Sequence, residues 1–269
     1  MGNFAAADMK FKRLQKNWEG LGSKDPMWAV LTNPLKKGKK WDSVSFYSSG
    51  EYEVKILLSL LTKRNITLPD KTTALDFGCG LGRLSRGLGS RFDKVTGIDI
   101  SSSMINKAKD ENKAYRNLQF ICNPTDDLSI LSSHQYSFLL SVITLQHIPA
   151  PFSHQYIREF MRVLKKDGIA MIQIPSQDLR DYTPLQKFRR WVRIRERLAL
   201  LGLGKGYTME MFVVSESEVT KLIHDNGGTL LAKYYTNHTD PSYDGKLIAS
   251  FDENLFTGFV STLYIVQKN

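Results

Sequence analysis

The sequence contains little cysteine and lacks both a long apolar run and a recognisable metal motif. Its 269 residues include only two cysteines, Cys79 and Cys122, which are too few for a disulfide framework and lack zinc-ligand spacing. The five histidines form no His-Glu-x-x-His pair, so we expect no dedicated metal site. No apolar run approaches the ~18 residues that cross a bilayer, and the N-terminus lacks the apolar core of a signal peptide. We therefore expect a reduced, cytoplasmic protein.

The composition that remains is that of an ordinary globular chain. Hydrophobic residues make up 42% of it and charged residues 24%, which supplies enough apolar material for a full core. Disordered and fibrous classes are thereby excluded. The length suits one generous domain, or one domain with a subdomain.

The net charge of +10 is concentrated in two short segments. Residues 34–41 carry four lysines and no acid, and residues 187–197 carry six basic residues against one acid. Together they supply nine of the ten net charges, so the rest of the chain is nearly neutral. In a helix, Arg190, Arg193 and Arg197 would share one face. That face is a solvated surface, a lid that offers guanidinium groups to an acidic substrate, or a contact with anionic lipid.

The middle of the chain alternates β-rich runs with amphipathic helical stretches, the pattern of a parallel sheet covered on both faces. Strands are predicted at residues 73–77, 94–99, 118–122, 137–143, 169–174, 229–236 and 258–267. Helices are predicted at 51–64, 81–92 and 216–226. Another begins at a cap formed by Ser101, Ser102 or Ser103 and runs through residue 109. A further helix precedes the fifth strand and ends in the basic turn Lys165-Lys166-Asp167-Gly168. The sequence therefore predicts an α/β fold.

A single domain with two additions is the predicted organisation. Residues 1–50 show no sheet periodicity and are interpreted as an N-terminal helical cap on a core formed by residues 51–175. Residues 176–215 interrupt the alternation for roughly 40 residues, too many for a plain connection, and are interpreted as an insertion or lid. Residues 216–269 resume the alternation with a helix and edge strands.

The strongest local signal is the glycine-rich turn Gly78-Cys79-Gly80-Leu81-Gly82, which joins a buried strand to a helix. Glycines there let the backbone approach a ligand closely and adopt positive φ. A dinucleotide fingerprint would need glycine where the chain has Arg83 or Ser85, and no phosphate-loop motif is present. Asp99 ends the next strand, 19 residues after the central glycine. An acid at that distance accepts hydrogen bonds from ribose hydroxyls.

Five segments in order resemble the class I S-adenosylmethionine-dependent methyltransferases. They are Leu75 to Arg83, Gly97 to Ser101, Met104-Ile105, Leu145 to Pro149, and Arg158 to Leu164 with the strand Ile172 to Ser176 that continues it. The resemblance implies a Rossmann-like, seven-stranded, mostly parallel sheet with helices on both faces, in which the two late strands form a reversed edge hairpin. It also implies S-adenosyl-L-methionine as the cofactor.

The same resemblance assigns roles to individual residues. The three glycines Gly78, Gly80 and Gly82 lie beneath the methionine part of the cofactor, and Asp76 faces its ammonium group. Asp99 holds the ribose, and Ile100 and Met104 border the adenine.

Other candidate site residues keep two or more interpretations. Asn123, Asp126 or Asp127 reads the adenine amino group. Tyr47 either closes over the cofactor or packs in the core. His147 follows the fourth strand at the carboxyl edge of the sheet, where its imidazole either takes a proton from an acceptor hydroxyl or caps the loop and packs under an aromatic ring.

Three functions are compatible with these features. The leading hypothesis is methyl transfer to a small or carrier-attached metabolite, at oxygen, such as an acidic sugar or a lipid-linked glycan. No Asn/Asp-Pro-Pro-Tyr/Phe sequence follows the fourth strand, which argues against amide and adenine-amino methylation. The basic segments suggest RNA methylation as a second hypothesis, but no RNA-binding module is appended, so nucleic acid is not the expected partner. The third is a non-catalytic cofactor-binding protein whose basic helix docks on a membrane or partner.

Overall fold

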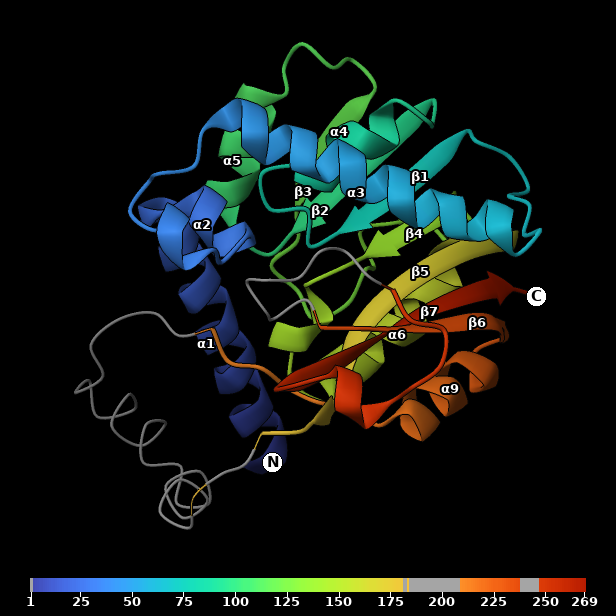
Figure 1. Ribbon diagram of the computed structural model, residues 1–269. Helices are drawn as coiled ribbons and strands as arrows, with labels where there is room; N and C mark the ends of the chain where they lie inside the picture. The colour runs from blue at the N-terminus through green and yellow to red at the C-terminus, as the bar shows by residue number, and fades with distance from the viewer. Residues whose placement is uncertain (1, 181–182, 184–208, 238–246) are drawn as a thin grey trace.

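The computed structural model describes residues 2–180, 183, 209–237 and 247–269. Its centre is one seven-stranded sheet with the order β3-β2-β1-β4-β5-β7-β6. The strands are β1 (Thr73–Phe77), β2 (Lys94–Asp99), β3 (Leu118–Cys122), β4 (Tyr136–Ser141), β5 (Leu164–Asp178), β6 (Gly228–Thr236) and β7 (Phe259–Lys268). The first five pair in parallel, whereas β7 runs antiparallel to both β5 and β6 (Figure 1). The predicted α/β fold with a mostly parallel sheet is confirmed.

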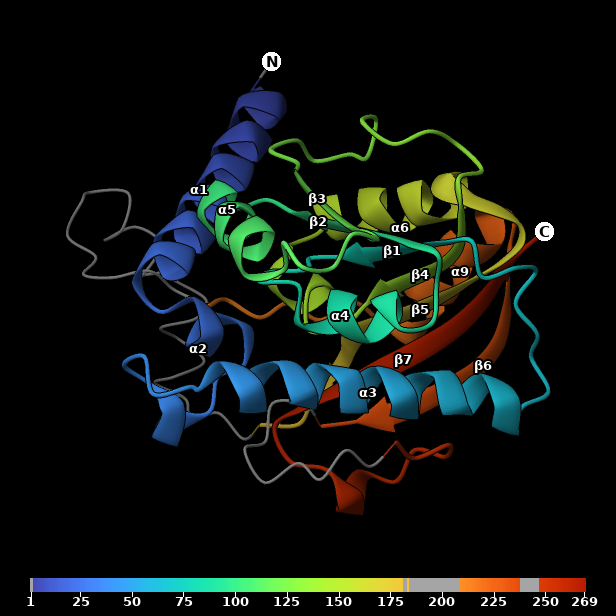
Figure 2. The ribbon, with the colours of Figure 1, turned by 90° about the horizontal axis from the view of Figure 1, so that it is seen from above.

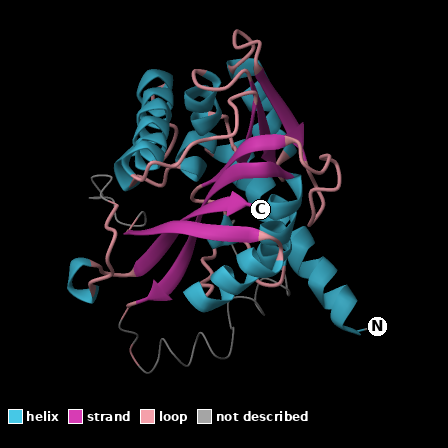
Figure 3. Cartoon of the chain, turned by 90° about the vertical axis from the view of Figure 1, so that its right-hand side faces the viewer, coloured by secondary structure: helices cyan, strands magenta, loops and turns pink. Residues whose placement is uncertain are grey.

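Helices cover both faces of the sheet and the edge at which the parallel strands end. They are α1 (Gly2–Lys24), α2 (Pro26–Val30), α3 (Ser43–Lys63), α4 (Arg83–Gly89), α5 (Ser102–Glu111), α6 (Phe152–Val163) and α9 (Glu216–Asp225), with the 3-10 helices η1 (Pro34–Lys36), η2 (Leu145–His147) and η3 (Glu253–Leu255). The helices α3 and α4 lie on one face and α6 and α9 on the other, and α1 and α2 stand at the end (Figure 2). The twisted sheet lies between the two helical layers (Figure 3).

The core is divided by the sheet into two apolar layers. Along β4 every residue is buried, and the side chains alternate between the layers. Leu139 belongs to the layer under α6, where it is fully buried with Phe160. Phe138 belongs to the layer under α3 and stacks on Phe92 at a ring distance of 5.3 Å. A strand buried on both faces is the expected centre of a doubly covered sheet.

The burial of β4 makes a stability prediction. Leu139→Ala should lower the free energy of unfolding by about 2–5 kcal/mol, because it leaves a cavity in a fully buried layer. Leu35, which is 82% exposed in η1, provides the matched control, and Leu35→Ala should change stability by less than about 0.5 kcal/mol. Urea denaturation measures both. Equal losses in the two variants would contradict this account of the core.

Several element boundaries differ from those predicted. The helix expected to end at Gly168 ends at Val163, because Leu164 is fully buried and already pairs with Tyr136 of β4. The predicted turn at 165–168 is therefore part of β5. The helix expected to begin at Glu51 begins at Ser43.

The capping residues explain where the helices begin. The side chain of Ser101, one of the three predicted candidates, accepts the N–H of Met104 and caps α5. Asp42 accepts the N–H of Ser45 and caps α3, which begins eight residues before the expected start. The boundary between cap and core expected at residue 50 thus falls inside α3. Most of the predicted insertion, 176–215, lies outside the described residues.

Candidate active site

The glycine turn after β1 is a tight loop in which the backbone conformation itself requires glycine. The three predicted glycines have positive φ: 75° at Gly78, 53° at Gly80 and 80° at Gly82. The N–H of Gly78 donates to the carbonyl of Ile98 at 2.8 Å, which ties the turn to the end of β2. A Cβ at Gly80 would lie 2.7 Å from Cγ2 of Val30 in α2. The turn therefore forms a close floor with α2 above it.

Asp99 stands at the end of β2 beside this turn. One carboxylate oxygen accepts the N–H of Gly80 and the other accepts the N–H of Ser101, each at 2.9 Å. Desolvation raises the pKa of the carboxyl group, while these two backbone bonds lower it. The residue is half-buried, so its oxygens retain lone pairs for hydroxyl donors on the cavity side.

Asp76 is the buried acid of the site. Only 2% of it is exposed, and it accepts a hydrogen bond from the hydroxyl of Ser85 in α4 at 2.6 Å. Burial, with a smaller contribution from nearby Asp99, raises its pKa to about 6, while Ser85 and the guanidinium of Arg83 oppose the shift. A cationic ligand beside this carboxylate would lower the free-energy cost of keeping it ionised in a buried position.

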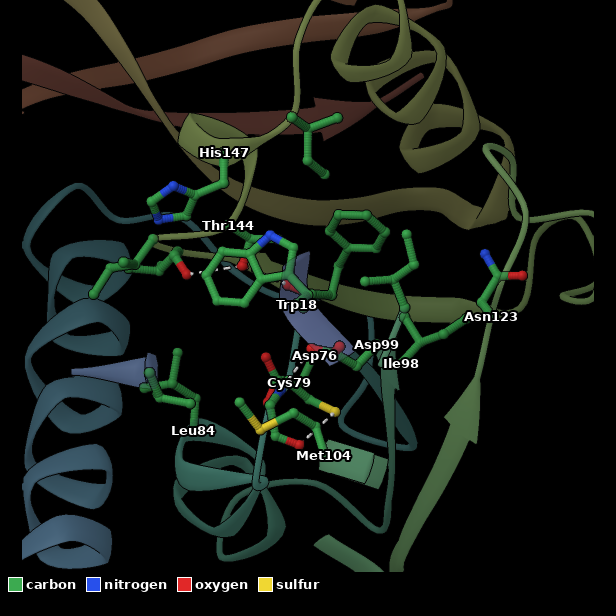
Figure 4. Close-up of a pocket in the computed structure, with 18 of the residues that line it drawn as sticks. Trp18, Asp76, Cys79, Leu84, Ile98, Asp99, Met104, Asn123, Thr144 and His147 are labelled. Carbon is green, nitrogen blue, oxygen red and sulfur yellow. Dashed lines mark hydrogen bonds between the residues drawn. The ribbon is translucent and has the colours of Figure 1, made fainter. Parts of the chain in front are cut away.

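One cavity brings most of the predicted site together (Figure 4). Of the residues assigned to the cofactor, those that line it are Asp76, Gly78, Gly80, Asp99, Ile100, Met104 and Asn123. It opens between the ends of β1 and β4, where the strand order reverses, the usual ligand position in open α/β sheets. His147 also lines the cavity. Among the three candidates for the adenine amino group, the structure places Asn123 at the cavity.

Four other predicted residues lie away from the cavity wall: Gly82, Tyr47, Asp126 and Asp127. The hydroxyl of Tyr47 is 2.6 Å from the carboxylate of Glu111 and 3.2 Å from the carbonyl of Leu81, and burial raises its pKa. Its ring packs in the core and joins α3 to the glycine turn. Asp127 accepts the N–H and hydroxyl of Ser129 and so closes a turn, and Asp126 is exposed.

His147 is buried in η2 with both ring nitrogens in hydrogen bonds. Its Nδ1 is 2.7 Å from the carbonyl of Glu210, and its Nε2 is 3.0 Å from Nε2 of Gln146. Because a carbonyl only accepts, Nδ1 carries the proton and Nε2 accepts from Gln146. Burial lowers the pKa of His147 to about 4, although the bond to Glu210 opposes this. The imidazole is therefore neutral at neutral pH, and Nε2 must leave Gln146 before it can accept another proton.

Trp18 is a site residue that the sequence analysis did not assign. It lines the cavity from α1, with its ring 5.0 Å from that of His147. Glu19 fixes this position, because its carboxylate accepts the hydroxyl of Ser101 and the N–H of Ser103 at the start of α5. The apolar face of α1 was the available signal, but only the contact with α5 directs it to the cavity.

The turn after β4 was also missed. Ile143 has a φ of 61°, an uncommon conformation for a β-branched residue. Its N–H donates to Oε1 of Gln173 at 3.1 Å, which holds the turn to β5. Thr144 then occupies the space where a Cβ at Gly78 would stand, and its hydroxyl donates to the carbonyl of Phe77 at 3.2 Å. The ends of β1, β4 and β5 are thus fixed together around the cavity.

Some predictions fall elsewhere. Arg190, Arg193 and Arg197 lie outside the described residues. Within the described ranges, no group of three or more His, Cys, Asp or Glu side chains could hold a metal ion. Of the helices that the structure describes, none has the length and apolar character to span a bilayer.

Sequence comparison relates the central part of the chain to methyltransferases. Residues 74–168 match a family described as "Methyltransferase domain". The chain is 28% identical over 123 residues to the ubiquinone biosynthesis O-methyltransferase of Coxiella burnetii, which is 45% of this chain and 50% of that protein. It is 35% identical over 109 residues to the 2-methyl-6-phytyl-1,4-hydroquinone methyltransferase of Synechocystis, covering 39% of this chain and 33% of that one. The chain thus spans half or less of these relatives.

Structural comparison extends the likeness beyond the matched segment. The crystal structure of magnesium protoporphyrin IX methyltransferase from Synechocystis, which contains S-adenosylhomocysteine, superposes with a TM-score of 0.52 at 17% identity. The superposition covers 81% of this chain and 83% of that one. At this identity the two proteins share the fold.

Proposed function

We propose that this chain, which belongs to the class I, Rossmann-like methyltransferases, transfers the methyl group of S-adenosylmethionine to a small-molecule acceptor. The observation that carries the proposal is the single cavity in which Asp76, the glycine turn and Asp99 meet at the ends of β1 and β2. An ammonium-bearing, ribose-bearing ligand needs an acid at each of two positions and a backbone floor between them.

The donor groups of the cavity fit this cofactor. Asp76 offers a buried carboxylate for an ammonium group, and Asp99 offers half-buried oxygens for ribose hydroxyls. Ile100 and Met104 supply apolar walls for a purine. The backbone at Gly80 can lie this close to Val30 only because no Cβ is present there. Bound S-adenosylmethionine supplies a sulfonium methyl group, which an acceptor displaces in line; the protein's part is to align the acceptor and exclude water.

An oxygen acceptor is the preferred proposal. The Coxiella relative is named as an O-methyltransferase, which supports an oxygen acceptor. The Synechocystis relative is named as acting on a hydroquinone, which fits methylation at either oxygen or carbon. The narrower proposal of an acidic sugar or lipid-linked glycan rests on the basic segments. One of them, 187–197, lies outside the described residues.

The proposal is tested with labelled S-adenosylmethionine and an extract of small metabolites. Wild-type protein should transfer label to an extractable small molecule, whereas Gly80→Val should not. A side chain at this position would clash with Val30, and the backbone there has a positive φ that valine rarely adopts. Cofactor binding without any transfer would favour the non-catalytic alternative.

The same assay examines His147. If the neutral imidazole is the base, its low pKa predicts an acid limb of the rate near pH 4, and His147→Ala and His147→Asn should both lose activity. If His147 mainly holds Glu210, His147→Asn should keep more activity than His147→Ala, because the amide can still donate to that carbonyl.

A further inference from the structure

A second cavity lies against the first. Its lining comes from the outer face of α1, the residues after η2, and the segment 209–214. Leu14, Trp18 and His147 line both cavities. These three side chains are therefore a common wall, and a molecule in the second cavity is one layer of side chains from the first.

The wall is anchored on both sides. Trp18 is positioned by α1, whose Glu19 binds the start of α5. His147 is held by the carbonyl of Glu210 at 2.7 Å, and the N–H of Phe212 donates to the carbonyl of Gln146 at 2.8 Å. The segment 209–214 thus packs along η2 and forms the outer wall of the second cavity.

The second cavity combines apolar and aromatic surface with positively charged side chains. Leu14, Trp18 and Phe212 contribute apolar and aromatic surface. Arg13 contributes a guanidinium group, which is 2.7 Å from the carboxylate of Glu210. Lys10, one turn earlier in α1, adds a second positive charge. Flat apolar surface beside a guanidinium suits an aromatic or otherwise planar molecule that carries an acid.

The ion pair between Arg13 and Glu210 is exchangeable. Both side chains are about one-third exposed, at 30% and 38%, and a pair at that exposure contributes little net stability. A ligand acid can therefore take the place of Glu210 at small cost. The backbone carbonyl of Glu210 would keep its bond to His147 during the exchange, so the wall stays in place.

We infer that the second cavity is the acceptor chamber, that it takes a planar, largely apolar molecule with one acidic group, and that this acid replaces Glu210 on Arg13. The inference rests on the proposed function and adds to it the chemical class of the acceptor. Because Trp18 and His147 border both cavities, the reacting atom of the acceptor would reach the cofactor past the edge of these two side chains.

The fluorescent probe 1-anilinonaphthalene-8-sulfonate, which is planar, apolar and anionic, tests the chamber directly. Titrated into protein saturated with S-adenosylhomocysteine, it should occupy one saturable site. Arg13→Gln should weaken its binding at least about tenfold, and Glu210→Gln should strengthen it, because the competing acid is removed. Ala150→Trp, which fills the cavity without touching the charges, should also weaken it. The matched control is Arg158→Gln on the exposed side of α6, which should have no effect.

The opposite signs expected for Arg13→Gln and Glu210→Gln separate a binding role from a structural one, since breaking the ion pair alone would move both variants the same way. Three results overturn the inference: displacement of the probe by S-adenosylhomocysteine, equal effects of Arg13→Gln and Arg158→Gln, or no saturable site. Calorimetry with S-adenosylhomocysteine alone reports on the proposed function separately. Loss of that binding would refute the cofactor assignment whatever the probe does.

Discussion

Asp99→Ala should weaken binding of S-adenosylmethionine at least about 100-fold, because a charged hydrogen bond contributes about 1.5–3 kcal/mol and two ribose hydroxyls lose their acceptor. The substitution also removes the partner of the Gly80 N–H, so the glycine turn loses one of its hydrogen bonds to β2. Isothermal titration calorimetry measures the affinity, and circular dichroism verifies that the variant is folded.

Two further variants sharpen this prediction. Asp126→Ala is the matched control, because this carboxylate is exposed and does not line the cavity. Its affinity should stay within about twofold of the wild type. Asp99→Asn retains an acceptor oxygen for one backbone N–H but loses the charge, so its affinity should lie between those of wild type and Asp99→Ala. Unchanged binding in a folded Asp99→Ala protein would remove the ribose assignment.

The residues assigned to the cofactor could be predicted from the sequence because they lie close together along the chain. A buried strand, a glycine turn and an acid 19 residues later are fixed by spacing along the chain. The strands 73–77, 94–99 and 118–122 were predicted residue for residue, since each is a short apolar run bounded by turn residues. Local pattern and fold agree at these three strands, whereas β4 and β5 differ from the predicted ranges 137–143 and 169–174.

The remaining walls of the cavity depend on contacts between distant segments. Trp18 lies at the cavity because Glu19 binds the start of α5, more than 80 residues later in the chain. The positive φ of Ile143 is held by Gln173 of β5, a bond that no local pattern encodes. The early end of α6 has the same origin, because pairing of Leu164 with β4 overrides the basic turn that follows. Tertiary contacts decided these features against local propensity.

Asp76→Asn should stabilise the free protein at pH 7 and lower its affinity for the cofactor. The folded-state pKa of about 6 exceeds the ordinary value of 3.8 because the carboxyl group is fully buried. Folding therefore favours the protonated acid, and stability falls as the pH rises from about 4 through 6. The difference between these two pKa values corresponds to a loss of stability of about 3 kcal/mol at pH 7. An isosteric amide that still accepts from Ser85 should recover a large part of this loss. Denaturant titrations at pH 7 and at pH 4 measure this, and the gain should disappear at pH 4.

Cofactor binding should show the opposite trend with pH. An ammonium group prefers the ionised carboxylate, so wild-type affinity should fall about tenfold per pH unit below pH 6 and level off above it. Asp76→Asn should bind weakly and without this slope. Ser85→Ala removes a hydrogen bond that lowers the pKa, so its slope should begin at a higher pH than in the wild type. A less stable Asp76→Asn protein at pH 7 would contradict the buried-charge account. A flat wild-type profile between pH 4.5 and 6 would instead refute contact between Asp76 and the ammonium group. The two measurements therefore separate the cost of holding this acid in the fold from its use in the site.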